Sequence, residues 1–397
     1  MLNDDPVVIV GAARTPIGSF QGVFSNFKGP DLGALAIKAA VDRAMVNPQE
    51  IEEVIIGCVL SAGIGQSPAR QAAIKAGLSK HVHCTTINKI CGSGMKTVML
   101  AVDSLLSGSC NIIVAGGLES MTNAPYILDK ARVGYRMGHQ QVRDHIFVDG
   151  LEDAYSGKLM GFFAEKTAEK YNFSRKQQDD FALISLERAI KARDARFFET
   201  DIEIVAVEVK SKKGEITLVK QDEGTFNIDP AKIPLLKPAF QENGTITAAN
   251  ASSIADGAAA LVLMRLSEAN QKQIKPLAKI LGSTSFAHEP EWFTTAPVGA
   301  IQKLLKKLSW NVNTPDLYEI NEAFAVVTMA TMQDLNISHE KVNVHGGSCA
   351  LGHPLGNSGT RIITTLLGAL KNRKQRLGIA SLCIGGGEAT AIAIEVI

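Results

Sequence analysis

The sequence predicts an α/β fold, and three observations support that prediction. Of its 397 residues, 46% are hydrophobic and 20% are charged, which is ordinary for a globular protein of two or three domains. Short runs of Val, Ile and Ala alternate with longer amphipathic segments, as expected when buried strands alternate with helices. The order of turn, helix, strand and glycine cluster occurs once in each half. These patterns predict a duplicated, layered α/β unit.

The first half begins with a buried strand at residues 7–10, which ends at Gly11. No GxGxxG segment follows this strand, which disfavours a dinucleotide-binding unit. The elements predicted next are a helix over 31–45, a strand at 54–57, a strand over 85–91, a helix over 95–106 and a strand at 112–115.

The proportion of charged residues rises between about residue 119 and residue 250. Residues 121–250 hold 39 of the 81 charged side chains, so we expect a solvated insertion there and not a central sheet. A helix over 177–193 and a hairpin around 212–215 are predicted inside it. Core composition returns at 258–264.

The last third of the sequence repeats the order of predicted elements found in the first third. Its predicted elements are a helix over 300–308, a strand at 316–320, a glycine-rich turn ending at 356–359, a helix over 360–370 and a strand at 379–383, which is followed by three glycines. Duplicated halves bring equivalent strand ends together, and α/β proteins place their sites at the carboxyl ends of strands.

Composition also excludes several classes of protein. A net charge of +1 argues against general nucleic-acid binding. Six cysteines without a CxxC pair predict neither a disulfide scaffold nor a zinc site, and we expect no metal. No apolar stretch approaches the roughly 18 residues of a membrane span. Without a recognisable secretion signal, we expect a cytoplasmic protein in a reducing compartment.

Cys91 is a candidate nucleophile because it lies where a predicted strand meets a predicted helix. A thiol near a helix N-terminus feels the positive end of the helix dipole, which lowers its pKa. Gly92 and Gly94 remove bulk beside it and let backbone N–H groups face a carbonyl oxygen. The alternative is a buried structural cysteine.

His353 lies in the glycine-dense segment 346–359, which we expect to be a shaped loop. It could act as a base for a thiol, or it could be a turn histidine bonded to the backbone. Cys383 ends a predicted strand and either acts on a ligand or packs in the core. Asn321 follows another strand, where its amide could donate to an oxyanion, cap a helix, or do both.

Four segments resemble the motifs of thiolases, in the order found in that family. They are residues 88–96 around Cys91, residues 321–325, residues 343–356 around His353, and residues 383–387. Residues 12–18 and 250–260 also match family patterns, so the resemblance covers essentially the entire chain.

The resemblance implies a thiolase fold, in which two βαβαβαββ halves are joined by a loop domain that covers coenzyme A. The implied boundaries are 1–120 for the N-terminal half, 121–250 for the loop domain, 251–275 for a return to the N-terminal half and 276–397 for the C-terminal half.

The resemblance also implies a role for each candidate. Cys91 would carry the acyl group, His353 would activate it, and Cys383 would be the second acid/base. Asn321 would hold a water that, with His353, stabilises the thioester oxyanion formed in condensation. The N–H groups of Cys91 and Gly385 would form the other oxyanion hole. The positions implied to contact coenzyme A are Ser252, Met160, Phe240 and Phe324.

Within the family, the sequence is most similar to acetyl-CoA C-acetyltransferases. These catalyse reversible Claisen condensation of two acetyl-CoA molecules through an acyl-cysteine, by a ping-pong mechanism, in fatty acid metabolism. The resemblance implies that acyl-CoA is the substrate and that there is no resident cofactor. No nucleic-acid or membrane partner is expected. The family suggests a homotetramer or homodimer.

Three alternatives stay open at this point. Leu159 stands where many acetoacetyl-specific members have His, so a longer-chain 3-ketoacyl-CoA thiolase is one alternative. Ketoacyl synthases share the fold but lack a second catalytic cysteine, so Cys383 argues against them. A non-catalytic subunit that binds acyl-CoA is disfavoured by the intact set Cys91, Asn321, His353 and Cys383.

Overall fold

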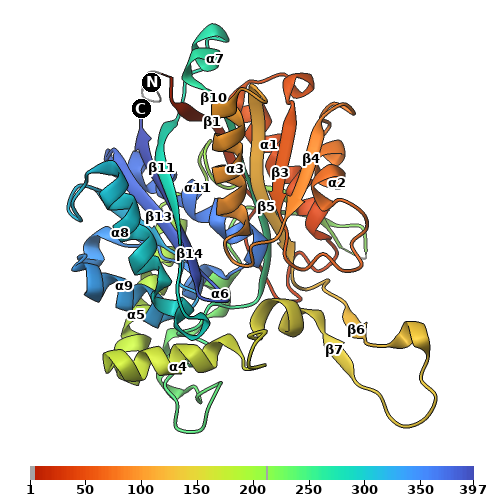
Figure 1. The fold of residues 1–397 in the computed structure, drawn as a ribbon, viewed down its shortest axis with the longest axis vertical. Helices are drawn as coiled ribbons and strands as arrows, with labels where there is room; N and C mark the ends of the chain where they lie inside the picture. The colour runs from red at the N-terminus through yellow and green to blue at the C-terminus, as the bar shows by residue number, and fades with distance from the viewer. Residues whose placement is uncertain (1–4, 212) are drawn as a thin grey trace.

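The computed structural model describes residues 5–211 and 213–397. Its centre is a ten-stranded mixed sheet in the order β12-β13-β14-β11-β1-β10-β5-β3-β4, with the short β2 paired to β10 (Figure 1). The predicted α/β class is therefore confirmed, and within the described residues the two copies of the unit meet at the middle of this sheet.

The first copy has the order βαβαβαββ. Its elements are β1 (Val7–Arg14), α1 (Gly29–Ala44), β3 (Glu53–Gly57), α2 (Pro68–Lys75), β4 (His83–Ile87), α3 (Ser93–Ser107), β5 (Ile112–Ser120) and β10 (Ala255–Arg265), with β2 (Gly18–Ser19) as a short addition. β3 pairs in parallel with β4 and β5, whereas β10 pairs antiparallel with β5 and β1. The insertion separates β5 from β10, its neighbour in the sheet.

The second copy repeats this order. Its elements are β11 (Ala278–Ala287), α8 (Ala296–Leu308), β12 (Leu317–Ile320), α9 (Ala325–Leu335), α10 (Ser348–Leu351), α11 (Leu355–Arg373), β13 (Leu377–Ile384) and β14 (Glu388–Val396). β12 and β13 are parallel, and β14 is antiparallel to both β13 and β11. A strand equivalent to β4 is reduced to one parallel bridge between Tyr318 and Val342.

Three apolar clusters show how the layers are stacked, because successive strand residues point to opposite faces. Val8 of β1 packs with Leu32 and Ile37 of α1 on the outer face of the first copy. Ile9 points the other way, into a core shared by α3, α11 and strands of both copies. The outer face of the second copy is covered by α8. Helices α3 and α11 therefore form the central layer.

Most of the insertion lies outside these layers, although Ile202 and Val207 enter two of the apolar clusters. It contains β6 (Tyr126–Leu128), β7 (Val142–Asp144), α4 (Met160–Tyr171), α5 (Arg175–Asp194), β8 (Val207–Lys210), β9 (Ile216–Val219) and α6 (Gly224–Asn227). β6 and β7 form an arm that extends from the body, and α4 crosses one end of the molecule (Figure 1). The remaining short elements are α7 (Leu266–Gln271) and the 3₁₀ or π turns η1 (Pro48–Glu50), η2 (Ala131–Val133), η3 (Phe147–Leu151), η4 (Pro230–Leu235), η5 (Pro290–Thr295) and η6 (His339–Lys341).

Most predicted elements are found within a few residues of the expected bounds. The predicted helix over 177–193 is α5, which starts with a capping box in which Ser174 accepts the N–H of Gln177. The hairpin is formed by β8 and β9, although Lys212 in its predicted turn lies outside the described residues.

Two predictions are wrong in detail. The strand expected over 85–91 ends at Ile87, because Ile90 has the left-handed φ of 46° and turns the chain before Cys91. The glycine-rich turn expected at 356–359 is instead the first turn of α11. Its glycines serve close helix packing and do not form a loop.

Helices α3 and α11 contact each other through backbone at their N-terminal ends. A Cβ on Gly359 would collide with the backbone nitrogen of Met95, and one on Gly94 would lie 2.8 Å from the carbonyl oxygen of Gly356. The hydroxyl of Thr360 donates to the carbonyl of Gly94 at 2.8 Å. Only glycine permits this approach.

We predict that Gly359→Ala lowers the free energy of unfolding by about 1–3 kcal/mol, because the new methyl group meets rigid backbone, despite the higher helix propensity of Ala. Urea unfolding followed by circular dichroism measures the change. Asn372→Ala, at an exposed position of the same helix, is the control. Equal unfolding midpoints for the two variants would contradict the tight crossing.

Candidate active site

Cys91 lies in the turn between β4 and α3, with Gly92 as the residue before the helix. The turn is fixed by Ser93, whose hydroxyl accepts the N–H of Lys89 at 2.8 Å and donates to the carbonyl of Ile90 at 2.7 Å. This arrangement holds the half-buried thiol of Cys91 at the N-terminal end of α3, as the sequence predicted.

The environment of Cys91 does not favour a resting thiolate. Burial raises the pKa of the thiol to about 11, while the N–H groups of Gly385 and of Cys91 itself point at the sulfur and act in the opposite direction. The expected lowering of the pKa by the helix end is therefore outweighed. Cys91 is a thiol at neutral pH and needs a base to react as a nucleophile.

His353 precedes the first turn of α11 and is 5% exposed. Its Nδ1 lies 2.6 Å from the hydroxyl of Ser358, which donates its own proton to the carbonyl of Pro354 at 2.9 Å. The serine oxygen is then an acceptor for the Nδ1 proton, and Nε2 keeps its lone pair. Burial, with a smaller contribution from the positive charge of Arg361, lowers the pKa of His353 to about 3. The ring is a neutral base.

Asn321 follows β12 and is fully buried. Its side-chain nitrogen lies 3.5 Å from Nε2 of His353, at the outer limit of a hydrogen bond, and its side-chain oxygen accepts the hydroxyl of Ser348 at 2.6 Å. Its backbone N–H donates to the carbonyl of Ser381 on the neighbouring strand. This bond aligns the carboxyl ends of β12 and β13.

Cys383 lies near the end of β13 and has no exposed surface. Burial raises the pKa of its thiol well above the ordinary value, and a negative charge on Cys91 would raise that pKa further. The two thiols are therefore close enough for the charge state of one to affect the pKa of the other. Gly385 follows two residues later, and its N–H reaches the sulfur of Cys91. The predicted residues Cys91, His353, Asn321, Cys383 and Gly385 are brought together.

The positions expected to contact coenzyme A border this site on the side of the insertion. Met160 begins α4, and its sulfur lies 3.4 Å from where a Cβ of Gly385 would be. Phe240 and Phe324 meet edge to face, with ring centroids 6.0 Å apart, in the apolar cluster that contains Cys383. The hydroxyl of Ser252 donates to the carbonyl of Ala323 at 3.0 Å. All four lie in or beside the apolar cluster that contains Cys383.

Glu119, which sequence reasoning left at the start of the charged insertion, proves to be 1% exposed. Its carboxylate accepts the N–H groups of Val59 at 3.0 Å, Leu60 at 3.0 Å and Gly356 at 2.8 Å. Burial raises its pKa to about 7, against these hydrogen bonds. Glu119 thereby ties the end of β5 to the start of α11.

Glu322 holds neighbouring segments together in a similar way on the other side of the site. Its carboxylate accepts the hydroxyl of Ser185, the side-chain amide of Asn343 and the N–H of Cys349, all within 3.1 Å. It fixes the segment leading to His353. An ion pair between Lys89 and Glu388 also joins the two cysteine-bearing segments near the surface.

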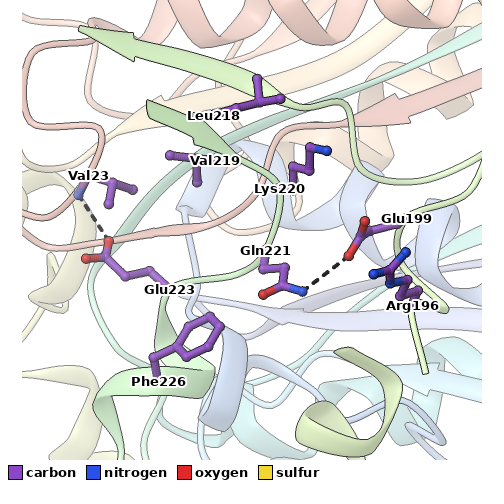
Figure 2. A pocket seen from close by; sticks show the side chains of 9 residues that line it. All are labelled: Val23, Arg196, Glu199, Leu218, Val219, Lys220, Gln221, Glu223 and Phe226. Atoms are coloured by element: carbon purple, nitrogen blue, oxygen red, sulfur yellow. Dashed lines mark hydrogen bonds between the residues drawn. The ribbon is translucent and has the colours of Figure 1, made fainter. Parts of the chain in front are cut away.

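A cavity of about 480 Å³ lies apart from the candidate catalytic residues, none of which lines it (Figure 2). Its polar groups largely satisfy one another, since Glu223 accepts the N–H of Val23 and Gln221 donates to Glu199. Among residues 5–211 and 213–397, no cluster of three His, Cys, Asp or Glu side chains could hold a metal ion. No helix in the same ranges is long and apolar enough to cross a membrane.

Two cysteines, a neutral histidine and an amide lie at the starts of α3 and α11 and at the ends of β12 and β13. This set of groups is typical of proteins that transfer acyl groups through a thiol. Family models confirm the resemblance seen in the sequence: "Thiolase, N-terminal domain" matches residues 7–267 and "Thiolase, C-terminal domain" matches residues 274–396. The chain belongs to the thiolase family.

Named relatives match over full length. Acetyl-CoA acetyltransferase 2 of Arabidopsis thaliana is 50% identical and covers 100% of this chain and 98% of its own. Acetyl-CoA acetyltransferase of Schizosaccharomyces pombe is 46% identical over 100% of both chains. Acat5 thiolase of Ascaris suum, crystallised in complex with coenzyme A, is 41% identical with a TM-score of 0.93 over 99% of this chain and 100% of its own. Bacillus anthracis acetyl-CoA acetyltransferase is 39% identical with a TM-score of 0.96 over 99% of both. The thiolase fold is thus confirmed.

We predict that Ser358→Ala slows alkylation of Cys91 by iodoacetamide at neutral pH by about tenfold or more, a part of the 10²–10⁴-fold that a positioned base contributes. Without its partner, the ring of His353 can turn or adopt the other tautomer. Mass spectrometry of the Cys91 peptide follows the rate. Thr364→Val is the matched control, because Thr364 also donates to the carbonyl four residues before it in α11. A rate unchanged by Ser358→Ala would exclude the positioning role.

Proposed function

We propose that this thiolase is an acetyl-CoA acetyltransferase, which joins two acetyl-CoA molecules into acetoacetyl-CoA and free coenzyme A, and which also runs in reverse. The observation that carries the proposal is the convergence of two thiols, one neutral imidazole and one oriented amide. Its support from outside the structure is the naming of full-length relatives for this activity. The chain is accordingly an acyltransferase.

The first half-reaction transfers the acetyl group to Cys91. Its sulfur attacks the thioester carbon of acetyl-CoA while Nε2 of His353 takes the thiol proton. The N–H groups of Cys91 and Gly385 face the sulfur, so they donate to the oxyanion that forms on the attacked carbonyl. The bond to the sulfur of coenzyme A then breaks, and Cys383 gives its proton to the departing thiolate.

The second half-reaction forms the carbon–carbon bond. The thiolate left on Cys383 removes a proton from the α-carbon of a second acetyl-CoA, and Asn321 with its water and His353 stabilise the resulting enolate oxygen. The carbanion attacks the acetyl group on Cys91, the thioester bond to Cys91 breaks, and the imidazolium of His353 returns the proton to the sulfur. Both thiols and the imidazole end as they began.

Coenzyme A is therefore a substrate, and the proposal needs no resident cofactor. We place its pantetheine arm along the apolar cluster of Met160, Phe240 and Phe324, with Ser252 beside it. The charged insertion at 121–250 would cover it as the loop domain between the two halves, with the return at 251–275. A solved relative holding coenzyme A supports binding of this ligand.

The setting of the enzyme is part of the proposal. We propose a cytoplasmic homotetramer or homodimer that serves fatty acid metabolism. A relative from Gibberella zeae, 44% identical over 100% of this chain and 99% of its own, is named cytosolic. The exposed apolar side chains of the β6–β7 arm, including Tyr126, Val133 and Met137, favour assembly through that arm.

We predict that Cys91→Ala abolishes the acetyl-enzyme, because Cys91 is the thiol toward which the N–H of Gly385 points. Intact-protein mass spectrometry after incubation with acetyl-CoA measures the modification, and the decay of Mg²⁺-complexed acetoacetyl-CoA absorbance on adding coenzyme A measures turnover. Cys84→Ser, at a partly exposed cysteine outside the site, serves as control. Turnover by Cys91→Ala would overturn the assignment.

We predict that Cys383→Ser separates the two half-reactions. Serine is a far weaker acid, so exchange of the α-protons of acetyl-CoA with deuterated water should fall by about 10²–10⁴-fold, whereas some acetylation of Cys91 remains. Nuclear magnetic resonance follows the exchange and mass spectrometry follows the acetylation. Equal losses in both would argue against separate roles for the two cysteines.

A further inference from the structure

The shape of the Asn321 side chain does not determine whether its oxygen or its nitrogen faces His353. The two ends of a primary amide are nearly the same size, so packing does not decide which end faces the reaction. If the oxygen faced His353, it would repel the negative charge that develops there in the second half-reaction. Something in the structure must therefore hold the nitrogen toward His353.

Two groups behind Asn321 supply that constraint. Arg361 donates from Nη2 to the side-chain oxygen of Asn321 at 3.3 Å and to the hydroxyl of Ser348 at 3.0 Å. Since Ser348 accepts from Arg361, its own proton goes to the oxygen of Asn321, at 2.6 Å. A guanidinium can only donate, so it accepts no NH₂ group in that place. The amide nitrogen is left to face His353.

Arg361 is itself held in place by an acidic partner. Its Nη1 donates to Glu319 at 3.0 Å, and the side chains are 1% and 2% exposed. Glu319 lies on β12, and Asn321 follows two residues later, where its N–H continues the pairing with β13. Both side chains therefore point to the same face of the sheet, toward α11. The ion pair and the amide thus form one connected chain from β12 to α11 and back to His353.

A buried ion pair of this kind contributes little to stability, because desolvation of both charges offsets their attraction. Its geometry has a clearer consequence for the amide. We propose that Arg361 and Ser348 are positioning residues that hold the NH₂ group of Asn321 toward His353 and the oxygen of the condensing thioester. This inference rests on the proposed function, since it depends on the part of Asn321 in the second half-reaction.

The test compares the two half-reactions in Arg361→Lys, which keeps the charge but loses the two-armed donation. Acetylation of Cys91 by acetyl-CoA should change little. Reaction of the isolated acetyl-enzyme with a second acetyl-CoA should slow by about 10–10³-fold, as expected for a misdirected oxyanion donor. Rapid-quench mass spectrometry measures both rates. Ser348→Ala, a smaller change at the same amide, should give the same imbalance in the same direction.

A double-mutant cycle separates positioning from a general structural effect. In an Asn321→Ala background, Arg361→Lys should cause no further loss in the second half-reaction, because no amide is left to orient. Arg14→Gln breaks another fully buried ion pair, to Glu203 and Asp222, and should alter stability without changing the ratio of the two rates.

Two results would overturn the inference in different ways. If Arg361→Lys slows both half-reactions equally, or loses as much in the Asn321→Ala background, then Arg361 does not act through the amide while the proposed function stands. If Asn321→Ala leaves the second half-reaction unchanged, then the proposed part of Asn321 fails and the inference fails with it.

Discussion

The structure depends on the backbone contact between the N-terminal ends of α3 and α11. One of these ends carries Cys91 and the other carries His353, so the separation of the candidate nucleophile and its proposed base depends on how closely the two helices approach. Gly94 and Gly359 allow that approach, and the bond from Thr360 to the carbonyl of Gly94 fixes it. Because each helix also packs on the strands of its own copy, the duplicated fold converts a shared core into an active site.

Buried polar side chains then fix the positions of the segments that carry the candidate residues. Glu119 accepts three N–H groups from the loop after β3 and the start of α11. Glu322 accepts the N–H of Cys349, together with one hydroxyl and one side-chain amide, in the segment before His353. Such carboxylates are costly to bury, and the compensation comes from backbone donors that would otherwise be unpaired. These two residues and the Arg361–Glu319 pair surround the candidate catalytic groups, and the proposed mechanism assigns none of the chemistry to them.

The sequence was sufficient to predict the α/β class, the duplication and the segments that converge, because strand runs, helical spacing and glycine clusters are local signals. It did not predict that residues 356–359 are helical, because their glycines are required by close packing against α3, a helix that is remote in sequence. Nor did it find Glu119, Ser358 or Arg361. Their roles depend on which backbone groups lie opposite them, and one sequence carries no such information.

Burial has one consequence that unites the site. It raises the pKa of Cys91 and Cys383 and lowers that of His353, so every group is neutral at rest. In the proposed reaction the thiolate of Cys383 and the imidazolium of His353 form as a pair of opposite charges, and the oriented N–H and NH₂ donors compensate for the enolate that follows. A carbanion survives only where water is excluded, and the same exclusion keeps the resting thiols protonated. The raised pKa values are therefore a condition of the proposed condensation and not an obstacle to it.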